Sequence, residues 1–578
     1  MYNVLKEYDK WKKEPSLSKK LKEDLVAIED DLTEIEDRFY KLLSFGTGGM
    51  RGLLGAGTNR VNIYTIRHVA EGLALFILDA GKDATRRGIA ISYDTRHCSQ
   101  EFALEVAKTI GKYGISVYLF KESRPTPELS FAIRHLGAYA GVMITASHNP
   151  RQYNGIKVYG KDGGQLPPAA ADGIVRHMED IKDLFAIRVK EEVELVENGI
   201  LAYLMNEIDM AYQRRLLSLI ENKDILKKYA NDLSIIFTPL HGSGLIPITD
   251  GLRSFGFNHV TVVQEQAAPN PEFPTVSYPN PEEKEVFELA IKLGRKIGAE
   301  LLLATDPDAD RLGVAVRKSD KEYMLLSGNQ LGAILLHYLL LQKQQKGELP
   351  FNGFVAKTIV TSELGRAIST KFGMQTINTL TGFKFISEKI EEFNSSGQYT
   401  FLFGYEESYG YLIGDFVRDK DAVQAALLTA EMTAYYKSKG KTLDDALNDL
   451  DKEFGYYRES SHSLTFEGKE GHSKIERIMS AFRNHPPKSI CTIPVLAIED
   501  YKLRTRQFSS GISEPLTLPE ADVIKLFLED DSWICIRPSG TEPKCKFYFG
   551  VQKNDRVSAE DTLRMMKQDL IEMISWIE

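Results

Sequence analysis

The chain has 578 residues, more than the roughly 250–300 at which a single hydrophobic core stops growing, so several domains are expected. A composition of 43% hydrophobic and 26% charged residues is typical of a globular protein and excludes a fibrous or disordered one. The formal net charge of −9, from 72 basic and 81 acidic side chains, offers no basic stripe for a phosphate backbone, so nucleic acid is not an expected partner.

The cysteines and the apolar runs indicate the compartment. The four cysteines form neither a CxxC pair nor a Cys/His cluster, so we expect no disulfide framework and no zinc site, in keeping with a reducing compartment. The charged N-terminus, MYNVLKEYDKWKKEPS, lacks the apolar core of a signal peptide. The longest nearly apolar run, Leu331 to Leu341, is shorter than the roughly 20 residues of a membrane span and predicts a buried helix. We therefore expect a cytoplasmic protein without membrane contact.

Residues 88–145 alternate between two kinds of periodicity. RGIAISYD, ISVYLF and AGVMITAS are apolar runs typical of buried strands, and the segments between them, SQEFALEVAKTIGKYG and PTPELSFAIRHLG, are typical of helices. Strands that alternate with helices of this length predict parallel βαβ units.

The same order of elements occurs twice more. Between residues 233 and 306 the predicted strands are LSIIFTPL, HVTVVQ and ELLLATD, and between 354 and 408 they are FVAKTIV, QTINTL and TFLFGYEES. The third strand of each unit ends in a polar cluster: TASHNP, TDPDADR or GYEES. Because ligands bind beyond the carboxyl ends of strands in open α/β sheets, we expect the three clusters to face one central cleft.

The C-terminal segment follows a different pattern. SWICIRPSGTEPKCKFYFGVQ predicts a strand, a loop and a second strand, and DTLRMMKQDLIEMISWIE predicts an amphipathic helix. The sequence therefore predicts a separate α+β domain, preceded by a polar linker from about Glu459 to Pro487.

Three aspartates at alternate positions, Asp306, Asp308 and Asp310, follow the apolar run LLLA. In an extended or loop segment alternate side chains point the same way, so three carboxylates converge. Hard oxygen ligands in that number suit Mg²⁺ or Mn²⁺. An EF-hand loop is excluded because its glycine position holds Arg311 and its final glutamate position holds Arg317. A solvated acidic turn is the alternative to a metal site.

Ser147 and His148 lie in a loop after the apolar run GVMITA. A serine hydroxyl is a poor nucleophile without a base, a metal or a neighbouring charge, and the G-x-S-x-G pattern of an esterase elbow is absent. Taken alone, this segment is more typical of a turn or a helix cap.

Two further segments offer polar groups for an anion or a sugar. Arg537, Ser539, Gly540 and Thr541 combine a guanidinium, two hydroxyls and a close backbone, which favours a phosphate cradle over a plain turn. In GYEES, Glu406 and Ser408 suit sugar hydroxyls, although a general acid/base pair or an exposed helix start are alternatives.

The glycine-rich segment Gly46 to Gly52 does not match a dinucleotide fingerprint, because Arg51 occupies the final glycine position and no strand leads in. A loop that delivers Arg51 to an anion is the better interpretation. His97 and His241 are more typical of loop histidines satisfied by backbone, and we assign them no role.

With TASHNP, TDPDADR, GYEES and RPSGTEPK in this order, the chain resembles the α-D-phosphohexomutase superfamily over essentially its whole length. FGTGGMRG, NGIKVYG and TLTGFKFI resemble the phosphoglucomutase/phosphopentomutase branch. The resemblance implies three repeated α/β domains with mixed, mostly parallel sheets and a C-terminal α+β domain around a central cleft. The implied bounds are 1–205 for the phosphoserine domain, 206–325 for the metal-loop domain, 326–455 for the sugar-loop domain, and 456–578 for the linker and phosphate-loop domain.

The resemblance also implies roles for individual residues. Ser147 is the residue phosphorylated in the active enzyme, and its oxygen joins Asp306, Asp308 and Asp310 around one Mg²⁺. Lys157 or His148 is expected to shuttle a proton. Other residues are expected to line the cleft or bind the substrate: Arg51, Arg311, Lys384, Glu406, Ser408, Arg537, Ser539, Gly540 and Thr541.

The implied reaction converts glucose 1-phosphate to glucose 6-phosphate through a glucose 1,6-bisphosphate that turns over within the cleft. The Glu-Glu-Ser of the sugar loop indicates glucose, because branches that favour mannose carry Glu-Met-Ser there. Phosphopentomutase is the alternative, and a phosphatase or a non-catalytic sugar-phosphate sensor is less favoured. Sugar phosphates are the expected partners of a monomer or homodimer.

Overall fold

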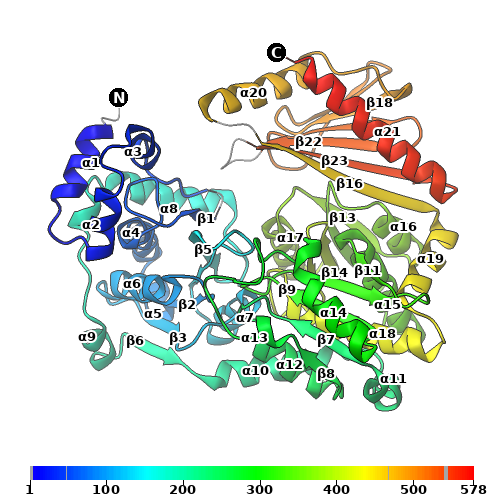
Figure 1. Ribbon diagram of the computed structural model, residues 1–578, viewed down its shortest axis with the longest axis horizontal. Coiled ribbons are helices and arrows are strands. Elements are labelled where there is room, and N and C mark those ends of the chain that lie inside the picture. Colours follow the sequence, from blue (N-terminus) through cyan, green and yellow to red (C-terminus); the bar gives the residue numbers. More distant parts are fainter. Residues whose placement is uncertain (1–3, 47, 466–467, 539–543, 578) are drawn as a thin grey trace. The chain divides into compact units, whose positions relative to one another are not determined.

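A computed structural model describes residues 4–46, 48–465, 468–538 and 544–577 and shows helices packed around several mixed sheets (Figure 1). The chain divides into two compact units. Unit 1 comprises Met1–Leu326, Ser387–Phe403 and Ser408–Thr442, and unit 2 comprises Ser327–Ile386, Gly404–Glu407 and Leu443–Glu578.

The first sheet of unit 1 has the strand order β1-β5-β4-β2-β3-β6. Its strands are β1 (Gly49–Leu53), β2 (Ile89–Tyr93), β3 (Val117–Phe120), β4 (Ala140–Ile144), β5 (Tyr153–Gly160) and β6 (Leu201–Leu204). β2 pairs in parallel with β3 and β4, and β5 pairs antiparallel with β4 and β1. The helices are α4 (Ile63–Asp79), α5 (Lys82–Arg87), α6 (Ser99–Gly111), α7 (Thr126–Leu136), α8 (Pro168–Asp180) and α9 (Glu192–Glu197). The βαβ units predicted for residues 88–145 are confirmed.

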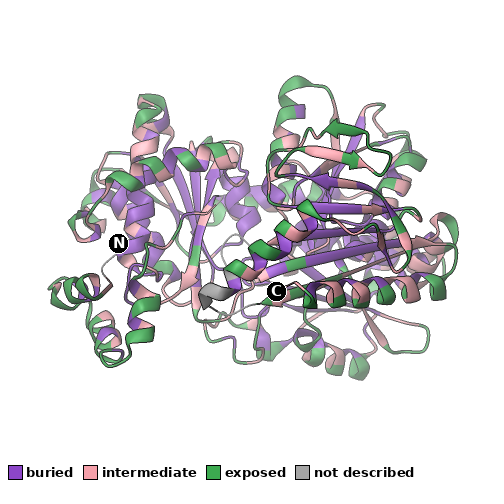
Figure 2. Ribbon diagram, turned by 90° about the horizontal axis from the view of Figure 1, so that it is seen from above, coloured by how far each residue is buried: buried purple, intermediate pink, exposed green. Residues whose placement is uncertain are grey.

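Burial explains why these strands form a sheet with helices on it. Every residue of β2 and β4 is buried, as expected for parallel strands covered on both faces. Figure 2 shows the same contrast, with buried strands beneath helices whose outer faces are exposed. The carboxyl ends of β2 and β4 lie side by side, since Tyr93 pairs with Ile144.

The second sheet of unit 1 has the order β11-β10-β9-β7-β8. Its strands are β7 (Ile235–Thr238), β8 (Val260–Val262), β9 (Leu301–Thr305), β10 (Leu312–Arg317) and β11 (Tyr323–Leu326). β7 pairs in parallel with β8 and β9, and β10 returns antiparallel beside β9. The associated helices are α10 (Asn206–Leu216), α11 (Lys223–Tyr229), α12 (Leu245–Ser254), α13 (Gln264–Ala267) and α14 (Glu288–Ile297). This is the second predicted repeat.

Three N-terminal helices pack on the first α/β layer of unit 1 (Figure 1). They are α1 (Val4–Lys13), α2 (Lys19–Val26) and α3 (Leu32–Phe39). Trp11 is fully buried and its ring lies 5.9 Å from Phe39, 5.6 Å from Tyr64 and 5.1 Å from Phe185. These edge-to-face contacts give the N-terminal helices a small aromatic core of their own.

The third repeat supplies further elements. They are α15 (Gly328–Lys346), β12 (Gly353–Thr358), α16 (Leu364–Lys371), β13 (Gln375–Thr379), α17 (Phe383–Ser396), β14 (Thr400–Glu406), β15 (Gly410–Leu412), α18 (Ala422–Ser438) and α19 (Leu443–Phe454). β12 and β13 pair in parallel, as predicted. The apolar run from Leu331 lies in α15, which begins with a capping box of Ser327 and Gln330 and is buried along most of its length.

The C-terminal part of unit 2 contains an antiparallel sheet with the order β16-β23-β22-β21-β18-β19-β20, and β17 pairs with β18. Its strands are β16 (Tyr456–Thr465), β17 (Ser489–Ile490), β18 (Ile493–Asp500), β19 (Thr505–Phe508), β20 (Ser513–Pro515), β21 (Ile524–Leu528), β22 (Trp533–Pro538) and β23 (Lys544–Lys553). Helices α20 (Gly468–Asn484) and α21 (Arg556–Ser575) belong to the same core. The predicted α+β domain is confirmed.

The linker predicted from about Glu459 to Pro487 is wrong. β16 pairs with β23 over ten residue pairs, from Tyr456 opposite Lys553 to Thr465 opposite Lys544. α20 buries Ile475, Ile478, Met479 and Phe482. β16 has no fully buried residue, so its sequence is polar although its backbone is fully engaged in the ladder. Because this edge strand is polar, its sequence has the composition of a linker and does not predict a strand.

Candidate active site

Ser147 lies three residues beyond the carboxyl end of β4 and is almost fully buried. Its backbone has a φ of 50°, in the left-handed region that a serine rarely adopts. Arg96, which forms a fully buried ion pair with Asp94 at 3.2 Å, donates hydrogen bonds to the carbonyls of Ser147 and Asn149. The Thr145 hydroxyl accepts from the Ser147 amide at 2.7 Å and donates to Asp94 at 2.6 Å. This network fixes the serine loop.

The aspartate loop follows β9 and is buried throughout. One carboxylate oxygen each of Asp306, Asp308 and Asp310 can be chosen so that all three lie within 4.8 Å of one another. Gly242 lies so close to this loop that an added Cβ would be 2.4 Å from the Cα of Pro307, so only glycine permits the approach. The three predicted ligands therefore converge, as expected.

Backbone amides or lysine side chains occupy one oxygen of each carboxylate of the triad. Asp306 Oδ1 accepts the amides of Asp310 at 3.1 Å and Arg311 at 3.0 Å. Asp308 Oδ2 accepts Lys157 Nζ at 2.7 Å, and Asp310 Oδ2 accepts the same Nζ at 3.0 Å. Lys420 Nζ lies 3.2 Å from Asp310 Oδ2.

The other oxygens of the triad form the surface available to a cation. Asp306 Oδ2 accepts the Ser147 hydroxyl at 2.7 Å. Asp308 Oδ1 and Asp310 Oδ1 are buried and accept no hydrogen bond from the described residues, although Arg311 Nε lies 4.0 Å from Asp310 Oδ1. Buried polar atoms normally have a partner, so these two oxygens are suited to bind a positively charged ligand. The donor set is entirely oxygen, which fits Mg²⁺ or Mn²⁺.

The titratable groups near Ser147 have pKa values shifted in different directions. Burial, reinforced by Asp308 and Asp310, raises the pKa of Asp306 well above its usual value. For Lys157, the two aspartates outweigh burial and raise its pKa, so it stays charged. Burial, followed by the charges of Arg311 and Arg51, holds the pKa of His148 well below its usual value. The Nδ1 atom of His148 lies 3.3 Å from Ser147 Oγ.

The structure also places the two predicted arginines. Arg51 is in β1, not in a loop, and its guanidinium donates to Asn149 Oδ1 at 2.7 Å, beside the serine loop. Arg311 immediately follows the triad and forms an ion pair with Glu282. Both therefore lie next to predicted functional segments of unit 1.

The structure describes four of the residues predicted to bind the sugar or its phosphate, and it gives contacts for two of them within unit 2. Glu406, at the end of β14, is buried and accepts the amide of Gly382 at 2.9 Å. Lys384 is buried, and its Nζ lies 5.1 Å from the centroid of the Phe385 ring. Ser408 is half-buried, and Arg537 is half-buried near the end of β22. Ser539, Gly540 and Thr541 lie outside the described residues.

Four family models match the chain in the order of its repeats. Their descriptions are phosphoglucomutase/phosphomannomutase alpha/beta/alpha domain I (residues 42–184), domain II (211–319), domain III (327–454) and C-terminal domain (503–562). Phosphoglucomutase of Staphylococcus saprophyticus is 40% identical over 515 residues, which are 89% of this chain and 91% of that protein. The chain belongs to the phosphoglucomutase/phosphomannomutase family.

Further relatives agree with this family. Phosphoglucomutase of Staphylococcus haemolyticus is 38% identical over 540 residues, covering 93% of this chain and 94% of that protein. Among solved structures, a putative phosphomannomutase from Thermus thermophilus matches with a TM-score of 0.67 at 22% identity, covering 93% of this chain and 99% of that one. Parafusin, a phosphoglucomutase from Paramecium, also matches with a TM-score of 0.67, at 19% identity, covering 93% and 94%. The resemblance to the α-D-phosphohexomutase superfamily and its four-domain fold are confirmed.

Three residues that contact the candidate site of this phosphoglucomutase/phosphomannomutase family member were missed in the sequence. Arg96 belongs to YDTR, and its place after the buried strand β2, next to β4, could have identified it. Thr126, the first residue of α7, and Lys420, two residues before α18, contact the triad from segments that carry no recognisable spacing. By contrast, His241 contacts Ala268 O and Thr275, and His97 contacts Glu272, so the structure gives neither a place at the triad.

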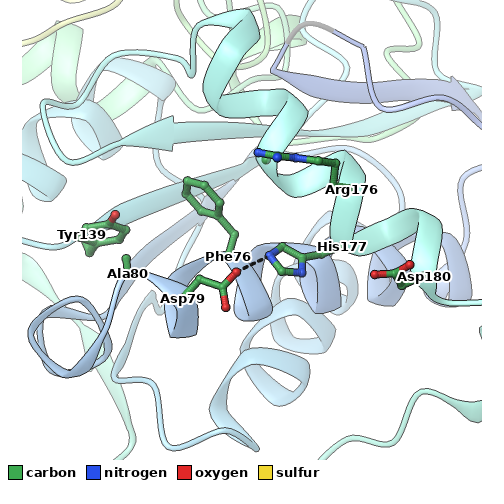
Figure 3. A pocket seen from close by; sticks show the side chains of 8 residues that line it. Phe76, Asp79, Ala80, Tyr139, Arg176, His177 and Asp180 are labelled. Carbon is green, nitrogen blue, oxygen red and sulfur yellow. Dashed lines mark ion pairs between the residues drawn. The ribbon is translucent and has the colours of Figure 1, made fainter.

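A hollow of about 430 Å³ lies elsewhere in the family's first domain, between α4 and α8 (Figure 3). Phe76 and Tyr139 face it, and His177 forms an ion pair with Asp79 at 2.9 Å on its wall. Tyr139 precedes the amino end of β4, whereas Ser147 follows the carboxyl end. The hollow is therefore separate from the candidate active site.

Within the part of the chain that the structure describes, no helix is long and apolar enough to cross a membrane.

Proposed function

We propose that this protein is a phosphoglucomutase, an isomerase that interconverts glucose 1-phosphate and glucose 6-phosphate. Relatives at 38–40% identity over most of the chain are named phosphoglucomutase. The observation that carries the proposal is the 2.7 Å hydrogen bond from Ser147 Oγ to Asp306 Oδ2, which puts a buried hydroxyl at the edge of a three-carboxylate site. A serine in that position can carry a phosphoryl group beside a divalent cation.

The proposed cycle begins with a phosphoserine at position 147. Its P–Oγ bond breaks as a new P–O bond forms to the free C6 hydroxyl of glucose 1-phosphate, giving glucose 1,6-bisphosphate. The hydroxyl proton passes to a base, and the serine oxygen leaves as its alkoxide and recovers a proton. After the bisphosphate reorients, the bond between its C1 oxygen and phosphorus breaks as Ser147 Oγ gives up its proton to a base and bonds to that phosphorus. The C1 oxygen takes up a proton, and glucose 6-phosphate is released. His148, with its Nδ1 3.3 Å from Ser147 Oγ, is the proposed proton shuttle, and Lys157 is the alternative.

One Mg²⁺ per chain is the proposed cofactor. Asp306, Asp308 and Asp310, with an oxygen on Ser147, would hold it, and the unsatisfied oxygens of Asp308 and Asp310 support this assignment. When bound, the ion neutralises charge on the phosphoryl group in transit. Lys157 and Lys420 hold the outer carboxylate oxygens in place.

The remaining roles are also proposals. Arg51 and Arg311 would line the substrate site beside the serine and aspartate loops, and we propose 1–205, 206–325, 326–455 and 456–578 as the bounds of the four domains. Proposed contacts to the sugar and its non-reacting phosphate are Lys384, Glu406, Ser408, Arg537, Ser539, Gly540 and Thr541. A cytoplasmic monomer or homodimer that binds sugar phosphates is the accompanying prediction.

The test uses the purified full-length chain with Mg²⁺ and a trace of glucose 1,6-bisphosphate. ³¹P NMR should show glucose 1-phosphate converted to glucose 6-phosphate, and Ser147→Ala should abolish conversion. Intact mass should show one phosphate that is absent from the variant. Absence of turnover with any hexose or pentose phosphate would overturn the proposal.

The same assay separates the alternatives. Faster conversion of ribose 1-phosphate than of glucose 1-phosphate would identify a phosphopentomutase instead. Release of inorganic phosphate without isomerisation would identify a phosphatase. Binding of sugar phosphates without either reaction would identify a sensor, although Ser147 and all three aspartates are present.

A further inference from the structure

The first residue of α7, Thr126, contacts the aspartate loop from a helix that contributes no proposed metal ligand. Its amide donates to the carbonyl of Asp308 at 2.9 Å, and its hydroxyl donates to Asp308 Oδ2, also at 2.9 Å. Both residues belong to unit 1 and are buried, and they are 182 positions apart in the chain.

The hydroxyl of Thr126 donates its hydrogen bond to a residue far away in the chain and not to its own helix. The residue before it, Pro125, is the N-cap of α7, and that cap makes no side-chain hydrogen bond to the helix. A hydroxyl has a single proton to donate, and Thr126 directs it to the remote carboxylate. A residue without a side-chain hydroxyl could not make this hydrogen bond to Asp308.

The two oxygens of Asp308 are in different states. Oδ2 accepts both Thr126 Oγ1 at 2.9 Å and Lys157 Nζ at 2.7 Å, whereas Oδ1 is buried and accepts no hydrogen bond from the described residues. Because the two oxygens of a carboxylate are chemically equivalent, these donors do not select one atom. Together they fix the orientation of the carboxylate plane and leave one oxygen without a partner among the described residues.

We infer that Thr126 is a positioning residue for a divalent cation: it acts through Asp308, fixing the orientation in which this carboxylate is presented to the ion. The inference deepens the proposed function and rests on its metal site. Residues that orient a metal ligand in this way commonly change metal affinity by about 10–100-fold when they are removed. The inference assigns Thr126 no chemical step.

The test measures Mn²⁺ binding to the metal-free full chain by the EPR signal of free Mn²⁺, so it does not depend on activity. Thr126→Val keeps the shape and removes the hydroxyl, and we expect its Kd to rise by about 10–100-fold. Thr126→Ser restores the donor and should bind nearly as tightly as the natural chain. Thr109→Val is the matched control, because Thr109 is fully buried in α6 and donates only to Glu105 O. Its Kd should not change.

Three outcomes would overturn the inference: Thr126→Val with an unchanged Kd, Thr126→Ser as weak as Thr126→Val, or no saturable Mn²⁺ binding by the natural chain. If far-UV circular dichroism shows that Thr126→Val is unfolded, Thr126→Cys replaces it, since a thiol is only a weak donor. Natural chain that binds Mn²⁺ but interconverts no sugar phosphate would contradict the proposed function and leave the inference standing.

Discussion

Ser147 illustrates how single residues are held at this site. A left-handed backbone costs a residue with a Cβ roughly 1–2 kcal/mol, yet Ser147 has a φ of 50°. Arg96 and Thr145 hydrogen-bond to its backbone, and both are tied to Asp94. The surrounding network therefore fixes a conformation that the serine itself does not favour, and the hydroxyl remains directed at Asp306.

Asp308→Asn should abolish most of the mutase activity without unfolding the chain. Asparagine has nearly the same shape but removes a negative charge from the triad, and a metal ion supplies several kcal/mol of transition-state stabilisation. The loss should be on the order of 10³-fold in kcat. A coupled assay of glucose 6-phosphate formation measures it. Asp320→Asn, in an exposed turn of unit 1, is the matched control. Equal activity of the two variants would contradict the metal assignment.

Lys357 should make stability rise with pH in the alkaline range. Burial lowers its pKa to about 8, despite Glu363 at 2.8 Å. Below pH 8 the lysine is charged in both states. Between about 8 and its unfolded value of 10.5, the unfolded chain binds more protons, so the free energy of unfolding increases by up to about 3 kcal/mol.

Lys357→Met should remove that part of the pH dependence. Glu363 keeps Arg366 as a partner at 2.8 Å, so the variant does not leave an isolated carboxylate. Urea unfolding at pH 7, 8, 9 and 10 measures the difference between the two chains. Lys371→Met, at an exposed lysine of the same unit, controls for general charge effects. A constant difference across this range would show that Lys357 has an ordinary pKa.

At the scale of elements, the N-terminal helices depend on Trp11. Trp11→Ala should destabilise α1 to α3 by about 3–5 kcal/mol, because it removes a fully buried aromatic side chain. Native-state hydrogen exchange of the amides in these helices measures the change. Leu5→Ala, on the same helix at a side chain that is 54% exposed, should have little effect. Similar exchange in both variants would mean that the helices do not share an aromatic core.

Strands with continuous apolar runs could be predicted from the sequence, whereas a polar strand could not. β2, β4 and β9 are apolar because both of their faces are buried, so they could be recognised directly. β16 has exposed and half-buried residues throughout, and its pairing with β23 spans about ninety residues of chain, which no local pattern reveals. The triad was predictable from its spacing. Thr126 and Lys420 were not, because their contacts depend on how α7 and the segment before α18 approach the loop.

At the scale of the whole molecule, the triad belongs to unit 1 alone. Mg²⁺ should therefore protect unit 1 from hydrogen exchange more than unit 2. At a hundred times its Kd, a ligand stabilises the folded state by about 2.7 kcal/mol, so amides of β4 and β9 that exchange by opening of the site should slow by up to about 100-fold. Mass spectrometry of peptides from both units measures this. Asp310→Asn should show no protection, and uniform slowing in both units would contradict a site confined to unit 1.

The N-terminal helices lie outside the region matched by the family models, although the matched region packs against them. The first family model starts at residue 42, after α1 to α3. Tyr64 and Leu184 lie within its range and are buried in the aromatic core with Trp11, and Arg60 is paired with Glu34 and Asp37 of α3. A chain that began at residue 42 would expose these apolar side chains to water as a hydrophobic patch that favours aggregation. Residue 42 therefore marks where the match to the domain I model begins, and we expect a chain without the residues before it to aggregate.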